Sequence, residues 1–372
     1  MTRYNKPVKI CFVVLKAYPL FNPDVKSNFG GAEVDSYLLA TELAKDKNFE
    51  VSFITADYGQ QPVEIHDGVT VIKSLDFNKS LIFAPWKLLC AMRRADALIY
   101  FRKMSSLVTA TVVLFCKFYG RIFVYRTANT HECDGTYLRH HWFRGRAFIW
   151  SLRSAKAVFT QNVTGSHSLL ANTGIASTAV GNAHRLPPPD QCSRDTILWV
   201  GRSADVKRPE LFLKLVRQLP DLHFTMICQK ATGDNRYDDF VGQAKQIKNL
   251  HFIPTVPFHD IDSYFQKAKV FVNTSDSEGF PNTFIQACKC STPILSLNVN
   301  PDKFLDKYNC GICCDGNWDK LLDSLKILLQ EKQYTELGKN ARNYAEQNHD
   351  IVKIIEQYKK LFIELAEQPT KD

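Results

Sequence analysis

The sequence predicts an α/β protein with two doubly wound, mainly parallel sheets. Along both halves of the chain, short apolar runs alternate with helical stretches, which is typical of parallel sheets covered by helices. The chain has 372 residues, about twice the usual length of one domain. Between the halves lies the proline run Pro187–Pro189, and consecutive prolines exclude both helix and central strand.

The first half begins with a clear strand and helix. Val8–Leu15 is almost continuously apolar, as expected for a strand buried on both faces. In Ala32–Asp46 the apolar residues recur with a helical period. Further strands are predicted at Val51–Thr55, Val69–Ile72, Ala97–Tyr100, Ile122–Tyr125 and Ala157–Thr160.

The alternation restarts after the prolines. Strands are predicted at Thr196–Val200, His223–Ile227, His251–Ile253, Val270–Asn273 and Ile294–Ser296. Helices are predicted at Pro209–Gln218, Asp239–Lys248, Ile261–Ala268, Pro281–Cys288, Trp318–Gln330, Tyr334–Gln347 and Ile351–Glu367. We therefore expect a linker at Gly181–Gln191, domains of residues 1–185 and 186–350, and a ligand cleft at the carboxyl ends of the strands.

Composition excludes several classes of protein. Hydrophobic residues make up 45% and charged residues 23%, so disordered and fibrous chains are excluded. The longest uncharged run near a peak of hydropathy, residues 104–116, is too short to span a bilayer. Eleven cysteines, an odd count without a small-domain framework, favour reduced thiols. With an N-terminus typical of a first strand, not a signal peptide, we expect a cytoplasmic protein.

The excess positive charge lies in the first half. Residues 1–190 hold 23 Lys and Arg against 14 Asp and Glu, whereas residues 191–372 hold 24 of each kind. Residues 78–156 alone hold 14 basic and 3 acidic residues. So local an asymmetry predicts a surface that meets an anionic partner.

Two glycine-containing segments are candidate phosphate sites. Gly30 and Gly31 precede a helix, where close backbone approach and helix-start amides favour an anion; the alternative is a flexible loop before an ordinary helix. The sequence WVGRSADVKRP places Arg202 and Lys207 between a strand and a helix. Arg can hold phosphate oxygens bidentately and Lys adds a compact charge, although a solvated basic turn would look the same.

The third segment is the most specific. In VFVNTSDSEGFPNTFIQA, a strand enters a loop with Glu278, and a helix then opens at a proline. The amides of Asn282 and Thr283, at the start of this helix, are expected to point at an anion. Glu278 could accept hydrogen bonds from a sugar, and Gln286, one turn further, could reach ribose hydroxyls.

In this order, GGAE, GRxxxxKRP and EGFPNTFIQA resemble the family 4 retaining glycosyltransferases (group 1 glycosyltransferases) of GT-B fold. The resemblance covers nearly the whole chain. It implies two Rossmann-like domains facing across a cleft, with the acceptor on residues 1–185 and a nucleotide-diphospho-sugar donor on residues 186–350. A C-terminal helix at about residues 351–367 would pack back on the N-terminal domain.

The resemblance also assigns the donor diphosphate. Arg202 and Lys207 would bind it, helped by the amides of Asn282 and Thr283. Gly31 would approach the diphosphate from across the cleft.

The sugar and ribose contacts follow from the same resemblance. Glu278 matches the first acid of the family's Glu-x7-Glu motif and takes a catalytic role. Gln286 stands where the family usually has the ribose-binding Glu; it keeps hydrogen-bonding capacity without the charge. Gly279, Phe280 and Pro281 would contact the donor sugar.

A histidine in the N-terminal half completes the expected site. The family often places a His after a central strand of the N-terminal domain, and here the candidate is His131. By resemblance it would hydrogen-bond the transferred sugar near the reacting carbon. Asn129 and Asp134 are alternatives in the same loop.

The implied reaction replaces the nucleoside diphosphate by an acceptor hydroxyl, with retention at the anomeric carbon. Arg202, Lys207 and the helix-start amides would stabilise the leaving phosphate, which in this family itself helps to deprotonate the acceptor. No metal or other cofactor is expected, because the two cations supply the countercharge. A zinc site at Cys288, Cys290, Cys310 and Cys313 is the disfavoured alternative.

A basic aromatic segment predicts a membrane-surface partner. Tyr137–Lys156 has five Lys and Arg and no acid. Its interleaved apolar residues are Trp142, Phe143, Phe148, Ile149, Trp150 and Leu152. Such a helix can lie among anionic headgroups, or it can simply face the protein core. The first interpretation predicts a peripheral enzyme on the inner face of the membrane that glycosylates a lipid-linked saccharide.

Two other functions remain possible on sequence grounds. One is a GT-B-like sugar-nucleotide epimerase or hydrolase, which needs no lipid acceptor. The other is a nucleic-acid-binding protein that uses the aromatic and basic residues of 137–156. We do not expect a nucleic-acid partner, because the most specific motif lies in the electroneutral half.

Overall fold

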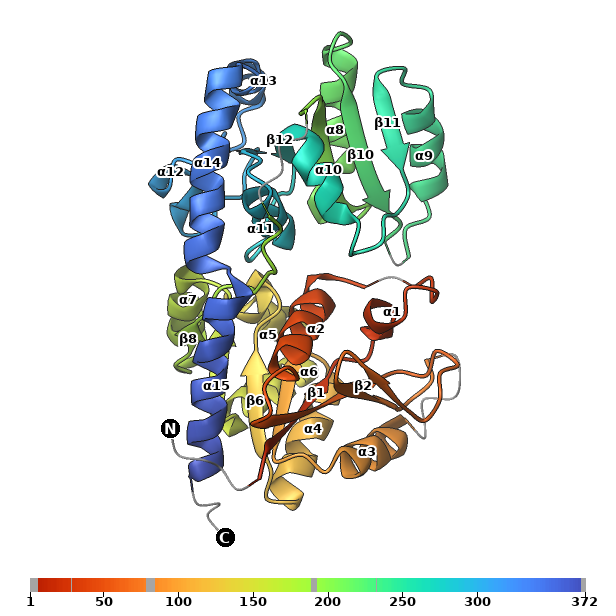
Figure 1. Cartoon of the computed structure of the whole chain (residues 1–372), viewed down its shortest axis with the longest axis vertical. Coiled ribbons are helices and arrows are strands. Elements are labelled where there is room, and N and C mark those ends of the chain that lie inside the picture. The colour runs from red at the N-terminus through yellow and green to blue at the C-terminus, as the bar shows by residue number, and fades with distance from the viewer. Residues whose placement is uncertain (1–5, 28, 78–83, 189–192, 232, 369–372) are drawn as a thin grey trace. The chain divides into compact units, whose positions relative to one another are not determined.

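A computed structural model describes residues 6–27, 29–77, 84–188, 193–231 and 233–368 (Figure 1). The chain divides into two compact units. Unit 1 comprises Met1–Arg185 and Ile351–Asp372, and unit 2 comprises Leu186–Asp350. Residues 189–191 of the predicted linker lie outside the described residues.

Unit 1 is built on an eight-stranded sheet in the order β3-β4-β2-β1-β5-β6-β7-β8. The strands are β1 (Val8–Val13), β2 (Phe49–Thr55), β3 (Val63–His66), β4 (Val69–Lys73), β5 (Ile99–Lys103), β6 (Ile122–Arg126), β7 (Ala157–Thr160) and β8 (Thr178–Ala179). Neighbouring strands are parallel except β3 and β4, which are antiparallel.

Helices follow most of these strands. They are α1 (Tyr18–Phe21), α2 (Gly31–Leu43), α3 (Ala84–Ala95), α4 (Leu107–Phe118), α5 (Thr136–His140), α6 (Trp142–Ser154), α7 (Val163–Thr173) and α15 (Ile351–Glu367), with a 3-10 turn, η2, at Thr130–Glu132. The C-terminal helix α15 packs on α2 and β1.

The two faces of the unit 1 sheet are covered by different helices. Successive strand residues point to opposite faces, and Cys11 and Val13 of β1 join a core cluster with buried residues of α3, α4 and α6. On β5, Phe101 packs instead against Tyr358 and Phe362 of α15, with ring centroids 6.1 and 6.4 Å away. Helices α3, α4 and α6 therefore share one face, and α15 lies on the other.

Unit 2 contains a six-stranded parallel sheet in the order β11-β10-β9-β12-β13-β14. Its strands are β9 (Thr196–Arg202), β10 (Phe224–Gln229), β11 (Leu250–Ile253), β12 (Ala268–Asn273), β13 (Ile294–Ser296) and β14 (Gly311–Cys313). Its helices are α8 (Pro209–Gln218), α9 (Tyr237–Lys245), α10 (Ile261–Lys267), α11 (Asn282–Lys289), α12 (Phe304–Lys307), α13 (Trp318–Leu328) and α14 (Glu331–Asn348), with 3-10 turns η3 (Asp205–Lys207) and η4 (Pro301–Lys303).

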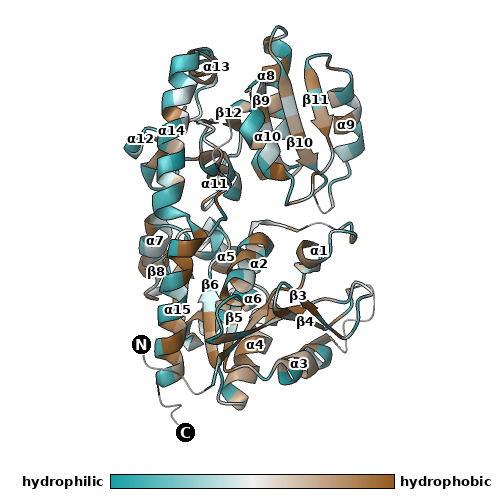
Figure 2. Ribbon diagram, in the orientation of Figure 1, coloured by the Kyte–Doolittle hydropathy of each residue, from teal (hydrophilic) through white to brown (hydrophobic). Residues whose placement is uncertain are grey.

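Both faces of this sheet are buried. On β9, Leu198 packs in a cluster with α10, α11 and α14, whereas Trp199 packs in a second cluster with α8 and α13. A strand buried on both faces has no polar side, and Figure 2 accordingly shows β10 mostly in the hydrophobic colours. This explains the nearly continuous apolar runs in the sequence.

The predicted α/β class with doubly wound parallel sheets is confirmed. Helices α8 and α15 and strands β7 and β13 have the bounds expected from the sequence. Three short strands, β3, β8 and β14, were not predicted, and Cys313 ends the last of them. The segment 137–156 was expected as one helix, but it breaks into α5 and α6 at His141.

Candidate functional site

In unit 2, the strand order reverses between β9 and β12. From β9 the chain moves to β10 and β11 on one side, whereas β12, β13 and β14 follow on the other. Ligands of open α/β sheets bind outside the carboxyl ends of the strands at such a reversal. The segments leaving β9 and β12 are the two that carry the sequence motifs.

An ion pair joins these two segments. Lys207, which ends η3 after β9, is hydrogen-bonded to Glu278 Oε2 in the loop after β12. The other oxygen, Oε1, accepts hydrogen bonds from Ser275 Oγ at 2.7 Å and from Asn273 Nδ2 at 3.2 Å. The carboxylate of Glu278 is therefore held on both oxygens. Of these four residues, the sequence analysis had predicted only Lys207 and Glu278 as site residues.

Thr274 fixes the backbone beside Lys207. Its buried hydroxyl donates to the carbonyls of Lys207 and Arg208 at 2.8 and 3.0 Å and accepts from Trp199 Nε1 at 2.9 Å. At Gly201 a Cβ would lie 2.7 Å from the Trp199 ring. A glycine is therefore needed here for the indole to reach Thr274.

Arg202 and Lys207, the two cations predicted to bind the diphosphate, have different surroundings. Arg202 ends β9 with an exposed side chain, and among the described residues it makes no hydrogen bond or ion pair. Arg208 instead pairs with Glu210 and Asp276. Of the basic residues in this segment, Lys207 is thus the one that the structure places against Glu278.

The start of α11 lies directly after Glu278. The helix begins at Asn282, one residue later than predicted, so Asn282 and Thr283 are its first two residues and Pro281 is its N-cap. N–H groups at a helix start point outward from the helix and favour an anion. The arrangement of Lys207, Glu278 and this helix start can therefore hold a ligand with both phosphate and hydroxyl groups.

The sugar and ribose candidates are more buried than the sequence suggested. The Phe280 side chain is buried, with its ring centroid 5.1 Å from that of Phe304 and 5.0 Å from that of His349. Any ligand contact of Phe280 must come from its backbone, as from Gly279, which has no side chain. Gln286 is likewise largely buried in α11.

In unit 1, the glycine pair forms the start of α2. Gly30 is the N-cap and Gly31 is the first helical residue. The buried carboxylate of Glu33 accepts a hydrogen bond from the Gly30 N–H at 2.9 Å. A carboxylate of the chain itself thus occupies part of this helix start. This contact counts against the prediction that the amides at the start of α2 are open to a phosphate.

His131 lies in η2, with an exposed side chain. Its Nδ1 is 3.7 Å from Asp134 Oδ2. Burial raises the pKa of Asp134, but the hydrogen bonds from Thr136 and the nearby charges outweigh burial and lower it. Asn129 is committed to the backbone, since its Oδ1 accepts from the Glu132 N–H at 3.2 Å. Asn129 and His131 are both exposed, whereas Asp134 is half-buried; of the two exposed residues, Asn129 is the one whose side chain caps the backbone.

Glu132, which the sequence analysis passed over, holds this loop in place. It is buried, and it accepts hydrogen bonds from the N–H groups of Ser105 and Ala128, both at 2.8 Å, and from Tyr125 Oη at 3.0 Å. Burial raises its pKa despite these bonds. No spacing in the sequence distinguishes Glu132 from an exposed acid.

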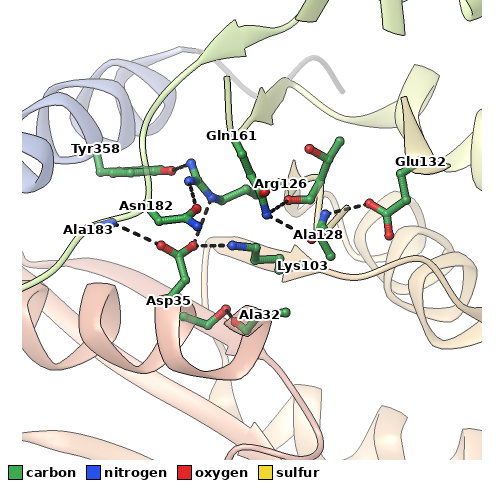
Figure 3. Close-up of polar contacts among 12 residues, drawn as sticks. Ala32, Asp35, Lys103, Arg126, Ala128, Glu132, Gln161, Asn182, Ala183 and Tyr358 are labelled. Carbon is green, nitrogen blue, oxygen red and sulfur yellow. Dashed lines mark hydrogen bonds and ion pairs between the residues drawn. The ribbon is translucent and has the colours of Figure 1, made fainter. Parts of the chain in front are cut away.

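A buried ionic cluster lies at the carboxyl ends of β5 and β6. Asp35 of α2 accepts from Lys103 Nζ at 2.7 Å and pairs with Arg126 Nε at 3.0 Å (Figure 3). Arg126 also donates to Tyr358 Oη at 2.6 Å and to Asn182 Oδ1 at 2.7 Å. The cluster joins α2, two strands and α15. In it, the carboxylate of Asp35 contacts two cations.

The structure also bears on possible metal ligands. Within the described ranges, no three His, Cys, Asp or Glu side chains gather as a potential metal site. The sequence contains one Asp-x-Asp triplet, at Asp260–Asp262, which the sequence analysis did not consider. Its Asp262 Oδ2 pairs with Lys289 Nζ at 2.6 Å. Cys288, Cys290, Cys310 and Cys313, the residues of the disfavoured zinc alternative, are all buried as free thiols.

Comparison with solved structures identifies the fold. The chain superposes on sucrose-phosphate synthase from Thermosynechococcus elongatus with a TM-score of 0.79 and 16% identity, over 97% of this chain and 99% of that one. The architecture is therefore GT-B, with two Rossmann-like units, as predicted. At this identity the likeness concerns the fold alone.

Part of the chain is similar in sequence to known glycosyltransferases. Residues 190–347 match the family model of the group 1 glycosyl transferases. An uncharacterized glycosyltransferase of Haemophilus influenzae is 25% identical over 193 residues, 49% of this chain and 53% of the relative. The O-antigen biosynthesis glycosyltransferase WbnH of Escherichia coli is 29% identical over 104 residues, 28% of each chain.

These matches confirm the predicted resemblance to group 1 glycosyltransferases, most directly for unit 2. The chain spans about half the length of the first of these relatives and less of the second.

Proposed function

We propose that this protein is a retaining glycosyltransferase that moves a sugar from a nucleotide-diphospho-sugar to a hydroxyl of a saccharide acceptor. The observation that carries the proposal is the contact between Lys207 and Glu278 at the strand reversal of unit 2. A cation, a fixed carboxylate and a helix start within one loop pair suit a ligand that has a diphosphate and a hydroxyl-rich ring.

Each group has a distinct role in the proposed reaction. Lys207 exchanges its contact with Glu278 for the donor diphosphate, and exposed Arg202 adds a second cation when the donor arrives. The N-terminal amides of α11, at Asn282 and Thr283, bind phosphate oxygens. Glu278, held by Ser275 and Asn273, accepts hydrogen bonds from the sugar.

The bond changes balance without a protein base. The bond from the anomeric carbon to the phosphate oxygen breaks, and a bond from the acceptor oxygen to that carbon forms on the same face. The acceptor proton passes to the leaving diphosphate, whose developing charge Lys207 and Arg202 stabilise. In this proposal the two cations take the place of a metal ion.

The acceptor belongs to unit 1 in this proposal, with His131 contributing a hydrogen bond to the transferred sugar. A role in the assembly of a cell-surface polysaccharide or glycolipid is supported by the similarity to an O-antigen biosynthesis glycosyltransferase. The acceptor is then a saccharide carried on a lipid, met by a peripheral enzyme at the inner face of the membrane.

Donor turnover with and without an acceptor tests this function. Purified protein is incubated with UDP-, GDP- and ADP-sugars, alone and with lipid-linked saccharides, and nucleoside diphosphate release is measured. We expect release that depends on the acceptor, and a product whose anomeric configuration, determined by NMR, matches the donor. Equal release without acceptor would indicate a hydrolase, and conversion of the donor sugar without release would indicate an epimerase.

A further inference from the structure

Large apolar side chains are exposed on one side of unit 1. Helices α3, α4 and α6 cover the same face of the sheet, and α4 lies against both of the others. Their outward residues include Phe118, 81% exposed, and Trp142 and Phe143, each 67% exposed. We name these outward surfaces the α3–α4–α6 face; its exposed large apolar residues are Trp86, Leu107, Leu114, Phe118, Trp142, Phe143 and Trp150.

This concentration is not a general property of the chain. In the described part of unit 2, only Val206 and Ile327 are exposed residues of this kind. Single exposed apolar residues are ordinary, whereas a gathering of them marks an interaction surface. The two units therefore differ in what they present to a partner.

The same face is strongly basic. The three helices hold seven Lys and Arg, three in α3, one in α4 and three in α6, and no Asp or Glu. The count excludes Arg102, Lys103 and Arg126, which the sequence analysis had included in the basic region but which are buried. The surface charge thus gathers where the aromatic residues are.

Cations and aromatic rings of this face lie against one another. Lys117 Nζ of α4 is 4.8 Å from the Trp150 ring centroid of α6, and Arg146 Cζ is 4.5 Å from that of Trp142. Arg93 Cζ of α3 is 5.1 Å from the Tyr119 ring centroid, directly after α4. These contacts bridge all three helices, so the face is one continuous basic and aromatic surface.

The inner sides of these helices form part of the core of unit 1. Phe148 and Leu152 of α6 are buried in the core of unit 1, so the core-facing alternative was correct for them. Trp142, Phe143 and Trp150 remain on the surface. The segment is therefore a core helix with a second, outward apolar set, and Figure 2 shows hydrophobic and hydrophilic residues mixed along α3 as well.

We propose that the α3–α4–α6 face docks on an anionic lipid bilayer, with the aromatic residues among the headgroups and the cations on lipid phosphates. No helix of the described residues is long and apolar enough to cross a membrane, so the contact would be with the bilayer surface. A second copy of the chain fits less well, because seven like charges would then meet seven. The biological purpose of this docking rests on the proposed function, because a lipid-linked acceptor would lie at the same bilayer surface.

Vesicle flotation with the full-length protein tests the docking. Vesicles of phosphatidylethanolamine and phosphatidylglycerol are compared with vesicles of phosphatidylcholine alone. We expect binding to the anionic vesicles, which weakens as salt is added, and little binding to the neutral ones. Absence of binding to anionic vesicles at low ionic strength would overturn the proposal.

Matched variants locate the contact. Because each exposed aromatic would leave water, Phe118→Ser with Trp142→Ser should lower vesicle affinity by about tenfold or more. Lys117→Glu should lower it by about fivefold or more. Ile327→Ser, which changes an apolar residue of unit 2 that is 49% exposed, is the control and should bind as the unchanged protein does. Equal binding by all variants would contradict the assigned face.

Two further measurements separate the possible failures. A single-stranded oligonucleotide is titrated in place of vesicles, and tight binding that Lys117→Glu abolishes, without vesicle binding, would assign the face to nucleic acid. Thermal melting with nucleoside diphosphates reports on unit 2 in the same samples. Nucleotide binding without vesicle binding would overturn only the docking, and the reverse result would overturn only the proposed function.

Discussion

The carboxylate of Glu278 is fixed by neighbours that all donate hydrogen bonds to it. Lys207 contacts one oxygen, while Ser275 and Asn273 contact the other. In the proposed reaction the donor takes Lys207 away from Glu278, and the two neutral hydrogen-bond donors still hold the carboxylate in position. We therefore expect the site to be organised before the sugar donor binds.

Ser275→Ala tests this positioning role. The change removes the 2.7 Å hydrogen bond to Glu278 and the 3.2 Å hydrogen bond that Ser275 Oγ accepts from Asn273 Nδ2. The direct contacts of Asn273 and Lys207 with Glu278 are not part of the change. Because hydrogen bonds to charged groups are worth about 1.5–3 kcal/mol, we expect kcat to fall by about tenfold or more while the KM for the donor changes little. Steady-state kinetics measure both.

Ser277→Ala, at an exposed position of the same loop, is the matched control. It should keep normal kinetics. If Ser275→Ala has the kcat of this control, Ser275 does not position Glu278. If its melting temperature collapses, the hydroxyl is mainly structural.

At this scale the sequence predicted residue types but not their orientation. Lys207 and Arg202 are both cations near the end of one strand, yet the first meets Glu278 and the second points to solvent. Phe280 stands in a ligand motif, but its ring contributes to the core. Spacing along the chain cannot show which way a loop side chain turns.

Among the elements, the buried cluster determines how α2, β5, β6 and α15 meet. Asp35 binds both Lys103 and Arg126, and burial opposes its ionisation, but the two cations lower its pKa overall. Burial lowers the pKa of Lys103 to about 8, with Asp35 opposing this effect and Arg126 adding to it. Of the three charged groups, Lys103 is thus the one whose charged form is disfavoured in the folded protein.

Lys103→Met should change how stability depends on pH. In the unfolded chain Lys103 keeps its proton up to about pH 10, whereas in the folded chain the pKa is about 8. Between these values the unfolded state binds more protons, so this lysine makes stability rise with pH. The free energy of unfolding of the unchanged protein, minus that of the variant, should rise by up to about 3 kcal/mol across this window.

Urea unfolding of both proteins at several pH values measures this difference. Taking the difference cancels the titration of the buried thiols and tyrosines, which both proteins share. Lys248→Met, at an exposed position, is the control and should give a flat difference. A flat difference for Lys103→Met as well would mean that Lys103 keeps its charge in the folded protein.

Elements with strong apolar patterns were predictable, and those set by pairing were not. The strands β7 and β13 and the helices α8 and α15 were expected with the bounds that they have. The strand β3 was missed because only Val63 and Ile65 of its residues are apolar, and both are exposed at the edge of the sheet. Likewise, burial of the basic residues that end β5 and β6 depends on Asp35, which is distant in sequence.

For the molecule as a whole, each unit has its own chemistry. Unit 1 holds the basic aromatic face and a C-terminal helix whose Tyr358 reaches Arg126. Unit 2 holds the loop pair with Lys207 and Glu278 and the group 1 family match. The local charge excess and the ordered motifs predicted which unit carries each of these features, whereas the cation–π contacts that make the face continuous required the structure.

The most direct test of the account is calorimetric titration of UDP, GDP and ADP into the unchanged protein, Lys207→Ala and the exposed-site control Lys245→Ala. We expect at least one nucleotide to bind the unchanged protein and the control alike. Lys207→Ala, still folded by its melting curve, should bind that nucleotide about 10- to 100-fold more weakly, because a charge-assisted phosphate contact is lost. Undiminished affinity in Lys207→Ala, or no binding of any of the three by the unchanged protein, would contradict the claim that this loop pair holds a nucleotide diphosphate.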